Sequence, residues 1–316
     1  MWKDEYTSVN DDIIKHRKAV IGFGCSFSDG QGAIEEEILN NYPWYIDGAN
    51  TLKWDKLTRE QQSEVRTKYH DVKTLRWMQN GTTLDFHLHE RRRAYSYQLA
   101  EMLGDHAGIN FGMRGNGNRA SISQLFTHPE LLLHRLEEII VIYTPAGVER
   151  FDFFQKTLND HHNFITMWPH EDSFPEDIWR SNLWGAYKHY LLSDLNILQE
   201  QVLQVRILET WLKSTGAKWK LIIVPAYDYA LYEQHYNGKA KEFYKKNWPH
   251  QYMWKPDGEL TFMNLVEQAE GLDRNSYYGY MGKGSPGGWV TPCAHPSIKG
   301  HKLFAEKLYE KIKNEA

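Results

Sequence analysis

Short apolar runs alternate with longer amphipathic segments along this chain, and this alternation limits the folds open to it. The apolar runs resemble strands buried on both faces, and they lie at 18–23, 107–111, 139–143 and 219–225. The segments with apolar residues every three or four positions predict helices, and they lie at 94–104, 119–136, 183–214 and 297–312. Strands that alternate with helices form a parallel sheet with both faces covered. We therefore predict an α/β fold, a three-layer α/β/α sandwich with a mostly parallel, doubly wound, flavodoxin-like sheet and a fifth strand within 258–290.

The 316 residues contain no internal repeat and no low-complexity linker, so a single domain over residues 1–316 is the simplest organisation. Two stretches have weak periodicity and many Trp, Tyr, Gly and charged residues, which predicts irregular insertions at about 40–93 and 226–290. The stretch 153–181 is predicted to be a loop-rich excursion from the sheet.

Composition narrows the class of function. The net charge of −4 supplies no basic field for nucleic acid or an anionic membrane, so neither is expected as a partner. The first residues are polar and no apolar run approaches about 18 residues, so we expect neither a secretory signal nor a membrane span. Two cysteines make no disulfide framework, which suits a reducing, cytoplasmic location. The 12 Trp and 19 Tyr can line a carbohydrate or peptide cleft, or can simply fill the core.

The first predicted strand runs into the sequence GCSFSDG at 24–30. A dinucleotide fingerprint needs glycine at position 27, a P-loop needs a lysine, and a nucleophile elbow needs glycine at position 28, so all three motifs are excluded. Ligands of open parallel sheets bind at the carboxyl ends of the strands. Ser26 is therefore placed where a nucleophile is useful, and the alternative is that Ser26 and Ser28 cap a helix.

Polar groups also follow the next two predicted strands. The stretch 110–118 is rich in Gly and Asn and includes Gly115 and Asn118, so its backbone N–H groups either converge on a negatively charged oxygen or form a plain turn. The third strand is followed by Thr144 and Arg150. The Arg150 guanidinium is suited to clamp a carboxylate or phosphate of a substrate, or to pair with a neighbouring acidic residue such as Glu149 or Asp152.

Three of these stretches together resemble the SGNH/GDSL hydrolases. Ser26 within Gly-Cys-Ser-Phe-Ser resembles the family's first block, Gly-Asp-Ser, which carries the nucleophile. Asn110-x-Gly112-x-x-Gly115 is similar to the second block, where a glycine N–H helps to form the oxyanion hole. His295-Pro, followed by an amphipathic helix, resembles the last block, which supplies the base. The Gly-Cys-Ser-Phe-Ser form, with Arg-x-Asp after the third strand, is most similar to versions encoded by tailed bacteriophages.

The resemblance implies a serine ester hydrolase that acts on acyl or acetyl esters of a small molecule or a glycan and needs no cofactor. Ser26 would attack, His295 would act as base, and Gly115 would help to hold the oxyanion. Asn118, Thr144 and Arg150 are the expected substrate-binding residues. For a phage-encoded chain, the resemblance also implies virion association, with virion or homo-oligomer contacts as partners.

Two departures from the family pattern leave a second hypothesis open. Pro292 stands where the family has an aspartate three residues before the histidine, and Thr144-Pro-Ala-Gly replaces Gly-x-Asn-Asp. Asn118 or Thr144 could replace the missing oxyanion donor, and Asp273, Asp257 or a backbone carbonyl could orient His295. The alternative function is a catalytically weak or inactive structural or host-recognition protein of a phage.

Two further features have open interpretations. His87 and His89 would share a face on a strand, but no third ligand is evident, so no metal site is expected. The only cysteines, Cys25 and Cys293, adjoin Ser26 and His295 in sequence. They form either a disulfide that blocks catalysis or two small buried apolar side chains.

Overall fold

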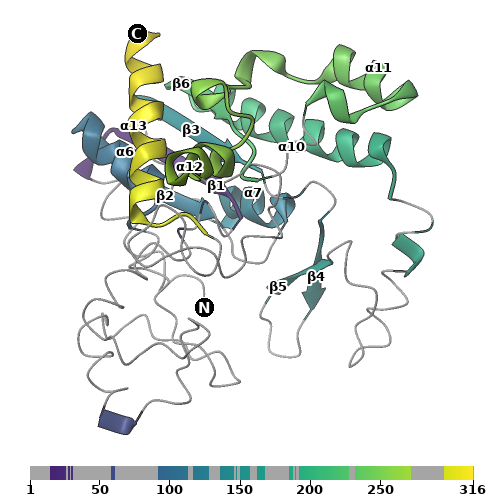
Figure 1. Cartoon of the computed structure of the whole chain (residues 1–316), viewed down its shortest axis with the longest axis horizontal. Helices are drawn as coiled ribbons and strands as arrows, with labels where there is room; N and C mark the ends of the chain where they lie inside the picture. Colours follow the sequence, from purple (N-terminus) through teal and green to yellow (C-terminus); the bar gives the residue numbers. More distant parts are fainter. Residues whose placement is uncertain are drawn as a thin grey trace.

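A parallel sheet forms the centre of the fold in the computed structural model of this chain (Figure 1). The structure describes residues 15–25, 28, 30, 58–60, 92–112, 117–127, 136–145, 147, 150–156, 162–167, 185–187, 189, 192–227, 232–271 and 295–315. The strands of this sheet are β1 (Lys18–Gly24), β2 (His106–Gly112), β3 (Glu138–Thr144) and β6 (Lys218–Ile223). Their order in space is β2-β1-β3-β6, with every neighbouring pair parallel. Four of the five predicted strands and the flavodoxin-like order are confirmed, because the first strand lies between the second and the third.

Helices cover both faces of the sheet (Figure 1). One face carries α6 (Tyr95–Leu103), α12 (Phe262–Glu270) and α13 (Ile298–Asn314). The other face carries α7 (Asn118–Thr127), α10 (Asp194–Ser214) and α11 (Gly238–Asn247). Alternate residues of β1 enter opposite cores, since Val20 packs with the first set and Ile21 with the second. The three-layer α/β/α architecture is therefore confirmed.

The excursion after β3 differs from the prediction. Strands β4 (Phe151–Lys156) and β5 (His162–Met167) pair in antiparallel fashion as a separate two-stranded ribbon, where the sequence analysis expected loops (Figure 1). Both segments are rich in aromatic or β-branched residues, which favour strands, but polar residues surround them and obscure this preference in the sequence.

The second predicted insertion, 226–290, is regular where the structure describes it. It contains α11, α12 and three short 3₁₀ turns, η5 (Glu233–His235), η6 (His250–Tyr252) and η7 (Pro256–Gly258). Helix α12 begins at the cap Thr261, whose hydroxyl accepts the N–H of Asn264 at 3.0 Å, and ends at Gly271 with φ 73°. These cap signals were available in the sequence. The expected fifth strand is absent from 258–271, while 272–290 lies outside the described residues.

The long helix before β6 is shorter than predicted. Helix α10 begins at Asp194 rather than near residue 183, because Ser193 caps it and accepts the N–H of Asn196 at 3.3 Å. Most of the first predicted insertion, 40–93, lies outside the described residues, as do His87 and His89. Within the described part of the chain, no helix has both the length and the apolar character needed to cross a lipid bilayer.

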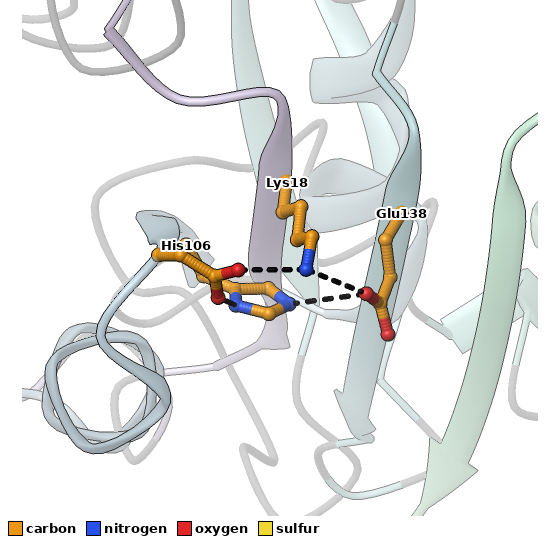
Figure 2. A network of polar contacts seen from close by, with 4 residues as sticks. Lys18, His106 and Glu138 are labelled. Atoms are coloured by element: carbon orange, nitrogen blue, oxygen red, sulfur yellow. Dashed lines mark hydrogen bonds and ion pairs between the residues drawn. The ribbon is translucent and has the colours of Figure 1, made fainter. Parts of the chain in front are cut away.

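The amino ends of three strands are tied together by charged groups (Figure 2). Lys18, His106 and Glu138 begin β1, β2 and β3 in register. Lys18 Nζ lies 2.6 Å from Asp105 Oδ2 and 3.6 Å from Glu138 Oε2. His106 Nδ1 lies 2.7 Å from Asp105 Oδ1, and its Nε2 lies 3.9 Å from Glu138 Oε2. This network fixes strand register at the edge of the sheet opposite Gly24.

The position of His106 in this network allows a prediction of how the stability of the fold depends on pH. Burial lowers the pKa of His106 below its usual value of 6.5, against the opposing pull of Asp105 and Glu138. The unfolded chain therefore takes up this proton at a higher pH than the folded chain does. The stability contributed by neutral His106 is complete above about pH 6.5 and is lost as the pH falls from there through the folded pKa. We expect His106→Gln to flatten the decrease in Tm between about pH 7 and pH 5.

The matched control is His189→Gln, because His189 is exposed. Thermal unfolding followed by circular dichroism should give this variant the same dependence on pH as the wild type. Equal slopes for wild type and His106→Gln would show that His106 does not carry the effect.

Candidate active site

The carboxyl ends of three strands meet at one point of the sheet. Gly24 of β1 is in register with Gly112 of β2 on one side and with Thr144 of β3 on the other. The chain leaves β1 towards β2 and then crosses back to β3, so this edge is the topological switch point, where open α/β sheets bind ligands. Ser26 follows Gly24 by two residues in the sequence, and Ser26 itself lies outside the described residues.

The residues on either side of Ser26 are held by neighbouring elements. The N–H of Gly24 donates to Ser121 Oγ of α7 at 2.8 Å, and that hydroxyl donates to the carbonyl of Phe111 at 2.8 Å. Asn110 Nδ2 donates to the carbonyl of Ser28 at 2.8 Å, while its Oδ1 accepts the N–H of Gly112 at 2.8 Å. The loop that carries Ser26 is therefore anchored at its two ends by β2 and α7.

Three buried hydroxyl groups, those of Ser28, Tyr95 and Thr144, cluster near the carboxyl end of β1. Ser28 Oγ donates to the carbonyl of Phe23 at 3.2 Å, Thr144 Oγ1 donates to the same carbonyl at 3.1 Å, and the two hydroxyls contact each other. Tyr95 Oη lies 3.2 Å from Ser28 Oγ and 3.1 Å from Thr144 Oγ1. Burial raises the pKa of Tyr95 to about 12, against the opposing hydrogen bonds of Ser28 and Thr144. The phenol therefore stays protonated and able to donate at neutral pH.

Tyr95 also connects this cluster to the segment that carries His295. The backbone N–H of Tyr95 donates to His301 Nδ1 at 3.3 Å, and the two rings stack with centroids 6.1 Å apart. His301 is fully buried on α13. Helix α13 is capped by Ser297, whose Oγ accepts the N–H of Gly300 at 3.3 Å. His295 is half-buried and precedes that cap by two residues, so it stands at the helix end tied to α6.

The loop between β2 and α7 is held by a carboxylate from β4. Asp152 is 2 % exposed, and it accepts the N–H of Gly117 at 2.8 Å and the N–H of Ala120 at 3.0 Å. Gly115, the predicted oxyanion donor, precedes Gly117 by two residues and lies outside the described residues. From the sequence, Asp152 was expected only as a partner for Arg150 and as the acid of the Arg-x-Asp motif. No local signal reveals its contacts, since they span 32 and 35 residues.

Asn118 faces a buried polar network on α10. Its Nδ2 donates to Gln201 Oε1 at 3.3 Å, and its side chain is nearly fully buried. Tyr143 Oη donates to Gln204 Oε1 at 2.9 Å and lies 3.4 Å from Gln201 Oε1. Burial raises the pKa of Tyr143 well above its usual value, so this hydroxyl is also a permanent donor. Gln201 therefore receives donors from both Asn118 and Tyr143, and it fixes the orientation of the Asn118 amide.

Arg150 lies near the carboxyl ends of β3 and β6. Its guanidinium carbon lies 5.5 Å from the centre of the Tyr227 ring, within the range of a cation–π contact. The Tyr227 hydroxyl in turn accepts the N–H of Gly147 at 3.0 Å. Tyr227 follows β6, so this contact links the segments after two strands of the sheet.

Of the two acidic residues considered as partners that orient His295, the structure describes only Asp257. Asp257 pairs with Lys307 Nζ at 3.3 Å. Lys307 lies nine residues after Ile298, so this pair is about 14 Å along α13 from the end that follows His295. Asp257 is therefore wrong as the residue that orients His295. Asp273, Pro292 and Cys293 lie outside the described residues, and Cys25 is fully buried among residues of the α6 and α13 face.

The described residues contain no group of three or more His, Cys, Asp or Glu side chains placed to hold a metal ion. The sequence matches no protein-family model and no curated protein. Among solved structures, the fold is similar to a protein of the lipolytic G-D-S-L family from Desulfitobacterium hafniense DCB-2, with 12% identity and a TM-score of 0.36 over 93% of this chain and 98% of that chain. It is also similar to the lipase/acylhydrolase from Enterococcus faecalis, with 16% identity and a TM-score of 0.31 over 95% of this chain and 96% of that chain. The fold assignment rests on the strand order and the two covered faces.

Proposed function

We propose that this protein is a serine ester hydrolase of the SGNH type, with Ser26 as nucleophile and His295 as general base. The observation that carries the proposal is the double contact of Tyr95. Its hydroxyl bonds Ser28, two residues after Ser26, and its backbone N–H bonds His301, on the helix that His295 precedes. A nucleophile and a base have to approach one another, and here a single residue joins the elements that carry them.

The proposed reaction proceeds through an acyl-enzyme. Ser26 Oγ attacks the ester carbonyl carbon while His295 accepts the hydroxyl proton, and the N–H groups of Ser26 and Gly115 stabilise the oxyanion. The bond to the alcohol then breaks, and His295 returns the proton to the departing oxygen. A water molecule attacks the acyl group, His295 takes its proton, and the acid leaves as that proton returns to Ser26. No cofactor takes part.

We assign the other candidate residues either to holding the Ser26 loop in place or to binding the substrate and its oxyanion. Thr144 has no exposed surface and its hydroxyl bonds the carbonyl of Phe23, so we assign it to support of the Ser26 loop. Asn118 is the proposed second oxyanion donor, oriented by Gln201. Arg150, steadied by the Tyr227 ring, is the proposed contact for the acid or sugar portion of a small-molecule ester or an acetylated glycan.

Labelling with a fluorophosphonate probe tests the proposal. The reagent bonds covalently only to a serine whose hydroxyl is activated by a base, so we expect the wild type to be labelled and mass spectrometry to place the adduct on Ser26. Ser26→Ala should abolish labelling. The control is Ser123→Ala, because Ser123 is a helix serine whose hydroxyl donates to the carbonyl of Ala120, three residues earlier in the same helix, at 2.7 Å. Absence of labelling in the wild type would overturn the hydrolase proposal and favour the non-catalytic alternative.

A further inference from the structure

Asp152 makes an unusual contact for a residue at the start of a strand. Both carboxylate oxygens are used, Oδ1 by the N–H of Gly117 and Oδ2 by the N–H of Ala120. The approach is so close that a Cβ at position 117 would lie 2.7 Å from Oδ2 and 2.9 Å from Oδ1. Glycine at position 117 is therefore required for this contact, because real Cβ atoms do not come so near another heavy atom.

The contact is also electrostatically favourable. Helix α7 begins at Asn118, so the two amides belong to its free amino end, where the helix dipole stabilises a negative charge. A buried carboxylate is costly unless it is hydrogen-bonded, and bonds from N–H groups to an ionised acceptor are the stronger kind. Asp152 thus caps the amino end of α7 from another element, by accepting the N–H groups of Gly117 and Ala120.

We propose that Asp152 is a positioning residue for the oxyanion donors at the amino end of α7. By holding the N–H groups of Gly117 and Ala120, it fixes the backbone on both sides of Asn118, the proposed second oxyanion donor, before the reaction begins. This inference rests on the proposed function. It adds that a residue of β4, two positions after Arg150, sets the geometry in which the transition state is stabilised.

The test compares Asp152→Asn and Asp152→Glu with the wild type. Asparagine keeps the shape of the side chain but places an N–H₂ group against one of the two amides, so one hydrogen bond is lost. We expect kcat for a short activated ester to fall by about 10- to 100-fold with KM nearly unchanged, because an interaction made only in the transition state is weakened. The rate of fluorophosphonate labelling should fall in parallel, and Asp152→Glu should recover part of both losses.

The matched control is Glu209→Gln. Glu209 is also a buried carboxylate with several donors, Arg206 at 2.5 Å, Lys213 at 2.8 Å and Tyr252 at 2.9 Å, but these belong to α10 and the 250–252 turn. Its loss should lower Tm and leave kcat unchanged. A catalytic effect that appears in Asp152→Asn and not in Glu209→Gln therefore separates positioning from general destabilisation.

A readout independent of activity completes the test. The amide resonances of Gly117 and Ala120 should move upfield in Asp152→Asn, and their hydrogen exchange should accelerate. If the wild type reacts with fluorophosphonate and Asp152→Asn reacts equally fast, the positioning role is overturned while the proposed function stands. If the wild type does not react at all, the proposed function is overturned, and the oxyanion role of Asp152 with it.

Discussion

Replacement of His295 by alanine is expected to lower kcat/KM for an activated ester by about 10⁴- to 10⁶-fold. A serine hydroxyl is a weak nucleophile until a neighbouring base removes its proton. Without the imidazole of His295, Ser26 is therefore expected to attack an ester very slowly. Initial rates of release of a chromogenic alcohol measure the effect. Ser26→Ala should show a loss of similar size, and Ser26→Ala/His295→Ala should lose little more, because the two residues act as a unit.

The control for His295→Ala is His189→Ala, since His189 is exposed on a segment between β5 and α10. Its kcat/KM should equal that of the wild type. A decrease of less than about tenfold in His295→Ala would remove His295 from the role of general base.

Gly24→Ala is expected to destabilise the folded protein by about 3–5 kcal/mol, among the largest effects of a single substitution. Gly24 has φ 153°, a conformation that side chains rarely adopt. A Cβ there would also collide with Ser28 Oγ and with the carbonyl oxygen of Thr144, and it would lie 2.6 Å from Thr144 Oγ1. The carbonyl oxygen of Thr144 belongs to the backbone of a paired strand, so rotation of a side chain cannot relieve that collision.

Chemical denaturation followed by tryptophan fluorescence measures this loss. The matched control is Gly104→Ala, because Gly104 also has a positive φ, 83°, but nothing lies within 4 Å of a Cβ built there. That variant should lose only the backbone cost of about 1–2 kcal/mol. If Gly24→Ala were as stable as Gly104→Ala, the close packing of the three strand ends would be wrong.

The central sheet could be predicted from the sequence because its strands are buried on both faces. Continuous apolar runs such as Ile139–Tyr143 mark such strands without any knowledge of their partners. The alternation of strands and helices predicted that the sheet is parallel and doubly wound. The β4–β5 ribbon and helix α12 were missed because the polar and glycine-rich residues around them were given more weight than local propensity and cap signals.

The location of the candidate site could be predicted from the sequence, but the hydrogen bonds within it could not. Positions 24–30 and 110–118 were identified because they follow strands, and chain order alone brings them to one edge. The contacts of Tyr95 and Asp152 join residues far apart in sequence, and no periodicity encodes such pairs. The single domain, the cytoplasmic or virion-associated location and the resemblance to phage-encoded versions stay predictions. The choice between a Cys25–Cys293 disulfide and two small buried apolar side chains stays open, because Cys293 lies outside the described residues.

The hydrogen bond between Ser28 and Tyr95 has an evolutionary consequence. These residues are 67 positions apart, yet their hydroxyl oxygens lie 3.2 Å from each other, so the two ends of the intervening segment meet at the same place. The entropic cost of closing a loop grows only with the logarithm of its length. The number of residues between Ser28 and Tyr95 can therefore change at little thermodynamic cost, while the contact between the two side chains is kept. Insertions and deletions in this part of the sequence are therefore compatible with the same packing of Ser28, Tyr95 and Thr144 at the strand ends.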